Sequence, residues 1–385
     1  MLSLLVFVLC VLYAQATSFY LEDAKLPLKD VVNKYGYPLE VHTIITPDGY
    51  ILGTHRIKHG RKSNTTNKNP ILLGHGMGAT SESFLALGKI SLPYYLADHG
   101  YDVWIMNARG NFFSRNHTHL NPDNDRQFWN FRLDEICLID LPANIDYISN
   151  VTKEKALFYV GHSQGTTAFF MLTSAKPEYN KKFKLAISMG PSVFLRFNEV
   201  ITGLLPYGAP ALSLVESFNF LELCTDMIRE SIREYCSTPM FETVCLQSFN
   251  FLSDAEFPND KNLLFWILRT IPSGLSIYQL KQYVQFTTSG FRYYDYGIQG
   301  NLKHYNAPYP PEYNIQNSKA PSALFYSDRD WITSPESVRL LGESLSNVIM
   351  YRVPFANFTH FDFIIHPDDV RLVYRPMVRL MEKYK

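Results

Sequence analysis

The sequence predicts an α/β fold in which helices cover a mostly parallel β-sheet. Short apolar runs, rich in β-branched and aromatic residues, end in glycine or in polar turns, and such runs are typical of strands buried on both faces. The segments between successive runs are long enough for crossover helices, and this alternation indicates parallel strands. Residues 134–147, with apolar side chains at Ile136, Ile139 and Ile145, illustrate such a helix. The runs span residues 71–74, 101–106, 157–160, 185–188, 323–326 and 348–353.

The alternation breaks between about residues 194 and 319. This stretch lacks clear buried strands and carries helical-looking, aromatic-rich pieces such as residues 263–268. An insertion between the fourth and fifth predicted strands would have this pattern, and we expect it to form a cap over the carboxyl ends of the strands. An ordinary second helical domain is the alternative that the pattern leaves open. The predicted division is a core of residues 17–193 and 320–385 with a cap of residues 194–319.

The N-terminus predicts a secretory signal peptide over residues 1–16. The segment MLSLLVFVLCVLYAQA carries no charged side chain, and its apolar run ends before an Ala-x-Ala cleavage signal at Ala14–Ala16. It departs from the usual pattern because no positive charge precedes the run. A membrane anchor is the alternative, but about 12 apolar residues fall short of the roughly 20 that span a bilayer. No later stretch of the sequence is long and apolar enough to span one.

Sequons and cysteines agree with a secretory route, either to the outside of the cell or to the lysosome. Four Asn-x-Thr sequons predict N-linked glycans at Asn64, Asn116, Asn150 and Asn357. With the signal removed, the mature chain keeps four cysteines, for which three complete pairings are open. One local disulfide and two buried thiols are plausible, and the cysteine spacing does not suit zinc. The cysteines of the mature chain are Cys137, Cys224, Cys236 and Cys245.

The charge balance argues against a nucleic-acid partner. Lysine and arginine together number 36, as do aspartate and glutamate, so the chain lacks the excess of basic residues on which nucleic-acid affinity depends. A neutral or apolar substrate remains open.

The segment Gly161-His162-Ser163-Gln164-Gly165 predicts a nucleophile elbow. An apolar strand ends at Val160, and residues 166–174 read as a helix, which is the strand–turn–helix setting that lifts a serine hydroxyl to the end of a sheet. The glycines permit a tight turn and close packing of the helix on the strand. A plain turn whose serine caps the helix is the alternative. The setting favours Ser163 as a nucleophile.

A serine hydroxyl needs a base, and at an elbow of this type the acid and then the histidine follow the serine in the chain. Only His304, His360 and His366 lie downstream of Ser163. His304 falls in the predicted cap, and His366 falls in what reads as a closing helix. His360 closely follows the last predicted strand and is therefore the better base.

The acid is expected on the loop after the fifth predicted strand. Asp328 and Asp330 both lie there, and both qualify from their position alone. Asp362 is too close to His360 in sequence to be the first choice.

The reaction also needs hydrogen-bond donors for the oxyanion. One donor is expected to be the backbone N–H that follows the nucleophile, on Gln164. The second is expected from the glycine-rich loop Gly74-His75-Gly76-Met77-Gly78, through Met77. A flexible glycine turn is the alternative for this loop.

These residues carry a resemblance to a known family. From about Tyr35 to the C-terminus, the chain resembles the acid lipases, the gastric and lysosomal lipases of the α/β-hydrolase fold, in a form similar to insect members. The matching motifs are Leu73-Gly74-His75-Gly76-Met77, Asn107-Ala108-Arg109-Gly110-Asn111, Ser114-Arg115-Asn116-His117, Asp140-Leu141-Pro142-Ala143, Gly161-His162-Ser163-Gln164-Gly165-Thr166-Thr167 and His360-Phe361-Asp362-Phe363.

The resemblance implies hydrolysis of neutral lipid esters, such as triacylglycerols or cholesteryl esters, at a lipid–water interface and without a cofactor or metal. It implies that Asp330, rather than Asp328, is the acid. It also implies a lid and cap near residues 194–319. The other site residues that it implies are the nucleophile Ser163, the base His360 and the oxyanion donors Met77 and Gln164.

A disulfide within the cap is also implied by the resemblance. Cys224–Cys236 is the expected pair, which leaves Cys245 free, and Cys236–Cys245 is the second choice. The sequence differs from the usual family motifs at residues 133–137, 189–192 and 249–261. None of these departures removes a catalytic position, although the last one touches the cap that shapes the acyl pocket. A catalytically silent lipid carrier and an esterase for short soluble esters are the rival functions.

Overall fold

The computed structural model describes residues 23–61, 69–195, 210, 212–218, 221–253 and 261–385. Within them, one eight-stranded sheet has the order β1-β2-β4-β3-β5-β6-β9-β10. All six predicted runs form strands of this sheet, which confirms the predicted fold class. The strands are β1 (Glu40–Ile45), β2 (Ile51–Ile57), β3 (Pro70–Gly74), β4 (Asp102–Ile105), β5 (Leu157–His162), β6 (Phe183–Met189), β9 (Ser322–Tyr326) and β10 (Val348–Arg352).

The strands from β4 to β10 in this order are parallel, whereas β1 and β2 form an antiparallel edge. Strands β3, β4 and β5 are buried at every position, because helices cover both of their faces. The carboxyl ends of the parallel strands share one edge of the sheet. Loops that follow β3, β5, β9 and β10 therefore converge there.

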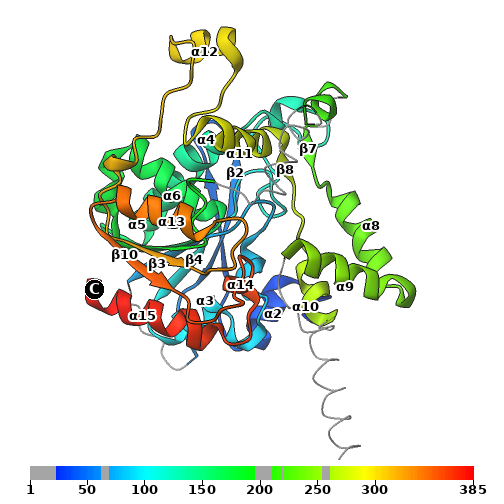
Figure 1. Cartoon of the computed structure of the whole chain (residues 1–385). Helices are drawn as coiled ribbons and strands as arrows, with labels where there is room; N and C mark the ends of the chain where they lie inside the picture. Colours follow the sequence, from blue (N-terminus) through cyan, green and yellow to red (C-terminus); the bar gives the residue numbers. More distant parts are fainter. Residues whose placement is uncertain (1–22, 62–68, 196–209, 211, 219–220, 254–260) are drawn as a thin grey trace, which may run out of the picture.

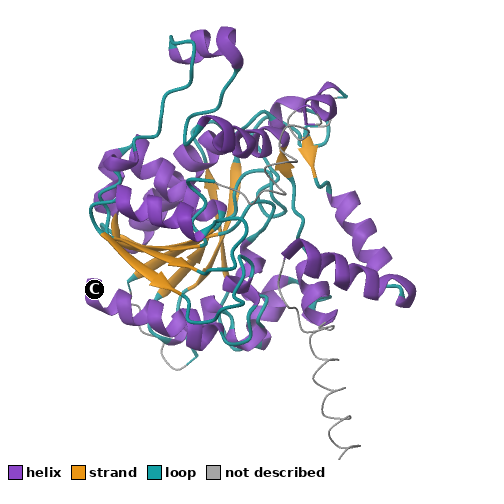
Figure 2. Cartoon of the chain, in the orientation of Figure 1, coloured by secondary structure: helices purple, strands orange, loops and turns teal. Residues whose placement is uncertain are grey.

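Two layers of helices enclose the sheet (Figures 1 and 2). One apolar core joins one face of the sheet to the first layer, and a second core joins the other face to the second layer. The first layer contains α2 (Leu28–Lys34), α3 (Leu92–Asp98) and α15 (Arg375–Met381). The second layer contains α5 (Leu141–Thr152), α6 (Gln164–Ala175) and α13 (Pro335–Ser344).

The predicted crossover at residues 134–147 is helical throughout. It is made of α4 (Leu133–Glu135), the π-helical turn η4 (Ile136–Asp140) and the start of α5. Ile136 and Ile145 are buried against the core, as the apolar pattern predicts. The remaining short turns are η1 (Ser81–Leu85), η2 (Gly88–Ile90), η3 (Arg126–Trp129), η5 (Pro177–Lys182), η6 (Ile315–Asn317), η7 (Val370–Tyr374) and η8 (Glu382–Tyr384), and α14 (Asp362–Ile365) is a single helical turn.

Between β6 and β9 the described chain is largely helical. The two short strands of this segment pair with each other and not with the central sheet. In Figure 1, α8 and α9 extend to one side of the molecule, and α12 projects from its top. The elements are β7 (Glu222–Leu223), α8 (Asp226–Cys236), α9 (Pro239–Ser253), α10 (Lys261–Ile267), β8 (Leu275–Ser276), α11 (Ile277–Ser289) and α12 (Gly297–Tyr305).

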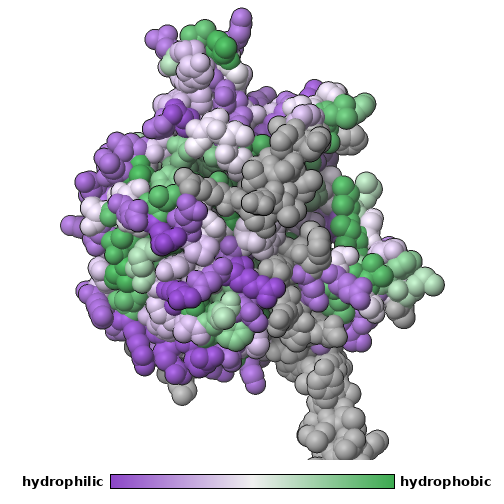
Figure 3. Space-filling model, viewed as in Figure 1, coloured by the Kyte–Doolittle hydropathy of each residue, from purple (hydrophilic) through white to green (hydrophobic). Residues whose placement is uncertain are grey.

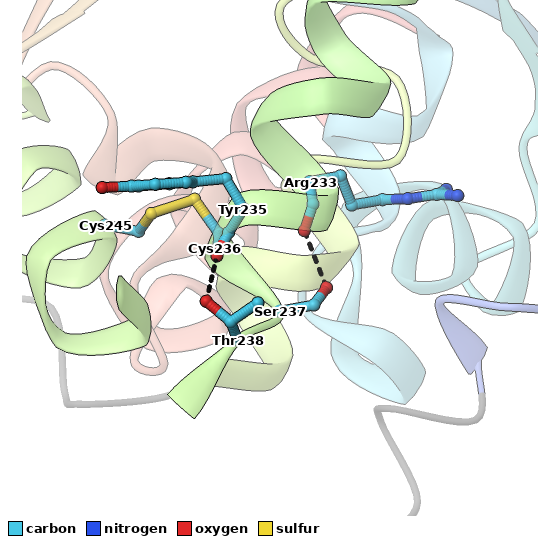
Figure 4. The surroundings of a disulfide bond; sticks show 6 residues. All are labelled: Arg233, Tyr235, Cys236, Ser237, Thr238 and Cys245. Carbon is cyan, nitrogen blue, oxygen red and sulfur yellow. Dashed lines mark hydrogen bonds between the residues drawn. A yellow bond between two sulfur atoms is a disulfide. The ribbon is translucent and has the colours of Figure 1, made fainter. Parts of the chain in front are cut away.

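A disulfide joins Cys236 to Cys245, so the expected pair Cys224–Cys236 is wrong and the second choice is right (Figure 4). Helix α8 separates Cys224 from Cys236, and a helix of this length spans about 16 Å, far beyond the roughly 7 Å that a disulfide can bridge. The chain turns after Cys236, where Ser237 and Thr238 donate hydrogen bonds to carbonyl oxygens of α8. This turn leads into α9 and brings Cys245 next to Cys236. Cys224 and the buried Cys137 are free thiols.

Three of the predicted glycan sites are exposed asparagines: Asn116, Asn150 and Asn357. Their glycosylation stays a prediction. Asn64 and the predicted signal peptide, residues 1–16, lie outside the described residues. Among the helices that the structure describes, none is long and apolar enough to cross a membrane.

Candidate active site

Ser163 lies between β5 and α6 in a strained backbone conformation. Its φ of 52° and ψ of −117° are rare for a residue with a side chain, and such strain persists only where the surroundings enforce it. The Ser163 N–H donates to the Met189 carbonyl of β6, and its own carbonyl receives the Thr166 N–H. The neighbouring strand and the first turn of α6 thus hold the elbow in place.

The two glycines of the elbow are sterically required. A Cβ on Gly165 would lie 2.1 Å from the Gly74 carbonyl oxygen of β3. A Cβ on Gly161 would lie 2.6 Å from the Gly165 carbonyl carbon. Such distances are far below van der Waals contact, so only glycine lets the helix pack this closely on the strands.

Asp330 and His360 form a buried pair on the loops after β9 and β10. The His360 Nδ1–H donates to Asp330 Oδ2 at 2.7 Å, and both side chains are almost fully buried. The Asp330 carboxylate also accepts hydrogen bonds from the Ile332 and Thr333 backbone and from the Thr333 hydroxyl. Asp328, the other candidate acid, instead pairs with Arg352 at the surface. The geometry therefore brings His360 together with Asp330.

Electrostatics favour the ionised form of Asp330 in this pair. Burial raises the pKa of the Asp330 carboxyl, but the attraction of the His360 ring and the hydrogen bonds from His360 and Thr333 outweigh it, so the pKa lies below its usual value. Asp330 is therefore ionised near neutral pH and orients the ring. His360 Nε2 is buried and has no hydrogen-bond partner among the described residues.

The other downstream candidates have different partners. His304 lies on α12 and stacks on Tyr296. His366 directly follows α14 and is not inside a helix. Asp362 accepts hydrogen bonds from the backbone and the hydroxyl of Thr359, and so shapes the loop that carries His360.

The glycine-rich loop after β3 passes next to Ser163. A Cβ on Gly76 would lie 3.4 Å from the Ser163 Cβ. The Gly76 carbonyl accepts a hydrogen bond from the His75 ring at 2.8 Å, and the peptide is planar, so the Met77 N–H points away from that ring. Gly76 and Met77 both line the cavity that Ser163 lines.

Two histidines that the sequence reasoning missed support these loops. Nε2 of His75 accepts hydrogen bonds from the Ala108 N–H and the Asn111 amide, and burial lowers the pKa of His75 to about 4. Nε2–H of His162 donates to the His360 carbonyl, and burial lowers the pKa of His162 to about 3. Both rings are neutral near neutral pH. His75 directly follows β3 and precedes Gly76, whereas His162 is the last residue of β5 and precedes Ser163. A histidine at the carboxyl end of a strand, next to a glycine or a serine, is the signal that could have found them.

A cavity of about 340 Å³ opens above Ser163 and His360. Its walls are almost wholly apolar, and about half of the apolar lining side chains come from the segment between β6 and β9. The side chains from this segment are Leu195, Phe249, Ile267, Ile271, Leu280, Tyr283 and Val284. A site of this kind suits an apolar ligand held against a few polar groups.

Comparisons with known proteins agree with this geometry. A profile of the α/β-hydrolase fold matches residues 69–367, and a profile of a partial α/β-hydrolase lipase region matches residues 28–88. Lipase 1 of Drosophila melanogaster is 37% identical over 369 residues, which cover 94% of this chain and 81% of the relative. Lipase member K of Homo sapiens is 33% identical, with 94% and 92% covered. Gastric triacylglycerol lipase of Bos taurus is 33% identical, with 94% and 93% covered.

The chain belongs to the acid lipase family.

Solved structures agree on the fold of this acid lipase. A bacterial membrane phospholipase A superposes with a TM-score of 0.52 at 14% identity, covering 100% of this chain and 99% of that one. A thermophilic esterase from Thermogutta terrifontis superposes with a TM-score of 0.52 at 12% identity, covering 90% and 99%. At these identities the likeness establishes the fold alone. Together, the lipase relatives and the α/β-hydrolase fold make this chain an ester hydrolase of the lipase type.

The described residues of this acid lipase contain no group of three or more His, Cys, Asp or Glu side chains that could hold a metal ion. The buried carboxylate of Asp140 is paired with Arg109 at 2.7 Å.

Proposed function

We propose that the protein hydrolyses carboxylic esters of neutral lipids through an acyl-enzyme on Ser163. The observation that carries the proposal is that Ser163, on its strained elbow, and His360, which is paired with the buried Asp330, line one apolar cavity. A nucleophile, an oriented base and an apolar acyl site are the three parts that such a reaction requires.

In this mechanism His360 Nε2 takes the proton of the Ser163 hydroxyl while Oγ attacks the ester carbonyl carbon. The backbone N–H groups of Met77 and Gln164 stabilise the negative charge that develops on the carbonyl oxygen. His360 then gives its proton to the leaving alcohol, and Asp330 holds the ring in register throughout. A water molecule, deprotonated by His360, releases the acid from Ser163.

The proposed substrates are triacylglycerols or cholesteryl esters. Apolar cap side chains line the cavity above Ser163, so an acyl chain would leave water as it enters and gain the free energy of apolar burial. The gastric triacylglycerol lipases among the relatives are named for the same class of substrate. Residues 194–319 would act as the cap on a core of residues 17–193 and 320–385.

A lipid–water interface is the proposed partner surface. Apolar side chains are exposed along α8 and the start of α9, on the side of the molecule where green atoms gather in Figure 3. Exposed apolar patches of this kind mark interaction surfaces. The patch consists of Met227, Ile228, Ile232, Tyr235, Met240 and Val244. We call it the α8–α9 patch. With the predicted signal peptide and sequons, it supports a secreted or lysosomal enzyme.

Replacement of the nucleophile tests the proposal. Ser163→Ala is expected to lower hydrolysis of a chromogenic long-chain ester by about 10⁴-fold or more, because no other group can form the acyl-enzyme. The wild type should react covalently with a fluorophosphonate probe, and Ser163→Ala should not. Hydrolysis by Ser163→Ala at the wild-type rate would refute the mechanism. A profile across acyl chain lengths, with a preference for short soluble esters, would refute the substrate class alone.

A further inference from the structure

The cap does more than line the cavity, because one of its segments is hydrogen-bonded to both loops proposed to hold the oxyanion. This segment, residues 273–279, leads from the end of α10 into α11. We call it the strap. At its start, the Ser273 N–H donates to the Gly78 carbonyl at 2.8 Å. Gly78 directly follows Met77, so this bond fixes the far end of the glycine-rich loop.

The strap also lies flat on the core beside that loop. The Ser273 hydroxyl accepts the Phe112 N–H at 2.8 Å, and Ser273 is fully buried. A Cβ on Gly274 would lie 2.6 Å from the Gly110 carbonyl oxygen, so the two backbones touch with no room for a side chain. The Ser276 hydroxyl donates to the Trp129 carbonyl at 2.7 Å. The strap is thus anchored to core loops at several points.

At its other end the strap reaches the elbow. The side-chain amide of Gln279 donates to the side-chain oxygen of Gln164 at 3.2 Å, and its oxygen accepts the Ser276 N–H at 3.0 Å. Gln164 and Gln279 are both buried. In a buried site the loss of one such partner leaves the other unsatisfied, which is unfavourable. The Gln279 amide is therefore one of the groups that hold the Gln164 side chain in place.

We propose that Ser273 and Gln279 are positioning residues, through which the cap holds Met77 and Gln164 in the geometry that receives the oxyanion. This inference rests on the proposed function and adds a role for the cap in the chemical step. Donors stabilise a transition state only when they are held in place before the charge develops, and small displacements weaken them. Without the strap, the N–H groups of Met77 and Gln164 would still be present, but the contacts from the strap that help to hold them in position would be lost.

Gln279→Met tests the proposal, because it removes the amide at nearly the same side-chain length. On a soluble chromogenic ester, kcat is expected to fall about tenfold with KM changed by less than about twofold, since the lost support acts in the transition state. The rate of fluorophosphonate labelling should fall by a similar factor. Gln282→Met is the matched control. Gln282 is a buried glutamine of the same helix that bonds Asp134 and Leu133 and no part of the elbow, so its kcat should stay near that of wild type.

Gln279→Glu distinguishes positioning from a merely structural role. The carboxyl group can still accept the Ser276 N–H, and the Gln164 amide can rotate to donate to it, so kcat should recover to within about threefold of wild type even where the melting temperature falls. Ser273→Ala keeps the backbone bond to Gly78 and removes only the acceptor of the Phe112 N–H, which loosens the anchor of the strap beside the glycine-rich loop. It should lower kcat about threefold, and it tests this end of the strap if Gln279→Met does not fold.

The proposal is overturned if Gln279→Met keeps wild-type kcat, if it loses no more than Gln282→Met, or if Gln279→Glu falls as far as Gln279→Met. Ser163→Ala in the same assay separates this result from failure of the proposed function. If Ser163→Ala is inactive and Gln279→Met is fully active, the proposed positioning role of the strap is refuted and the proposed function is not.

Discussion

At the residue scale, burial sets the charge of several titratable side chains around the candidate site. Burial lowers the pKa of His55 and of His75 to about 4 and that of His162 to about 3. Their neutral forms are favoured in the folded state, so their contribution to stability is full above the ordinary histidine pKa and is lost as the pH falls toward 4. The pKa of the Asp369 carboxyl is shifted in the opposite direction. Burial, and after it repulsion from Asp362, raises this pKa well above the usual value.

Asp369 gives a pH-dependent prediction. Its Oδ1 atom has no hydrogen-bond partner among the described residues, and its folded pKa exceeds its unfolded pKa, so stability is lost as the pH rises from about 4 through the folded pKa. Asp369→Asn mimics the protonated form at every pH. We expect no gain below pH 4 and a gain on the order of 1–3 kcal/mol at pH 7, measured by chemical denaturation across that range.

The neighbouring Asp368 supplies the control for this experiment. Asp368 is exposed and pairs with Arg371, so Asp368→Asn should not reproduce the rise in stability with pH. A gain by Asp369→Asn that is equal at pH 4 and pH 7 would contradict the expected ionisation of Asp369.

At the element scale, the contact between α6 and β3 decides whether the elbow can form. Gly165 is the first position of α6 after Gln164, and its Cα packs against the backbone of Gly74. Helix and strand approach this closely because neither carries a side chain at the contact. The Ser163 conformation depends on that approach, since the N–H groups of Thr166 and Thr167 in the first turn of α6 donate to the Ser163 carbonyl.

Gly165→Ala is therefore expected to be severe. The new Cβ would meet the Gly74 carbonyl oxygen at 2.1 Å, and because backbone must move to relieve this clash, we expect a loss of about 3 kcal/mol or more together with loss of esterase activity. Denaturant titration and activity per folded molecule measure the two effects.

A glycine in open space serves as the control. Gly100 has a φ of +89° and no atom within 4 Å of its Cβ position, so Gly100→Ala should cost only about 1–2 kcal/mol of backbone strain and leave activity intact. Equal effects of the two substitutions would mean that the packing of α6 on β3 is not the critical contact.

At the scale of the whole molecule, the exposed apolar side chains are unevenly distributed. The α8–α9 patch lies on one side, and a smaller pair, Ile298 and Leu302, lies on the projecting α12 at the top of Figure 1. The α8–α9 patch shares helix α9 with Phe249, which lines the cavity, whereas none of the described lining residues belongs to α12. The proposed lipid surface should therefore meet the protein on that side.

Met227→Gln combined with Met240→Gln tests this orientation. Met227 is 74% exposed and Met240 is 79% exposed, so the folded protein should tolerate both changes. Each methionine that leaves water at a lipid surface contributes about 1.5 kcal/mol or more, so the double variant should bind an emulsion at least about tenfold more weakly. Hydrolysis of emulsified long-chain esters should fall, and hydrolysis of a soluble short ester should not.

Ile298→Gln combined with Leu302→Gln is the matched control on α12. It removes a similar apolar area from another part of the surface and should leave both activities unchanged. A double variant on α12 that loses emulsion activity as strongly as the α8–α9 variant would place the lipid contact elsewhere.

The sequence predicted the parts of the molecule that local patterns encode. Strands such as β5 are buried on both faces and therefore appear in the sequence as continuous apolar runs. The elbow is formed by five consecutive residues, so its motif can be recognised locally. The chain order of serine, acid and histidine then leads to His360 and to two candidate acids, Asp328 and Asp330. The family resemblance selects Asp330, and the structure pairs Asp330 with His360. β1 and β2 were not predicted, because β1 is largely exposed and has no such run. The turn residues Asp48-Gly49 between them were the available signal.

The parts that the sequence did not predict depend on tertiary distances. The choice between Asp328 and Asp330 follows from which side chain points inward, which residue patterns do not tell. The disulfide follows from the turn between α8 and α9, and the wrong pairing put a whole helix between its cysteines. Gln279 and Gln164 are 115 residues apart in the chain, and nothing local to either residue marks the other as its partner.

The segment proposed as the cap leaves the core at the carboxyl end of β6 and returns at the amino end of β9, and these two parallel strands are hydrogen-bonded neighbours in the sheet. The sheet therefore holds both ends of the segment at fixed positions, and we expect the segment to be exchangeable. A chimaera could take the acyl pocket of a relative without moving Asp330 or His360. In such a chimaera, residues 273–279 should keep the sequence of the present protein, because these residues are hydrogen-bonded to loops of the core.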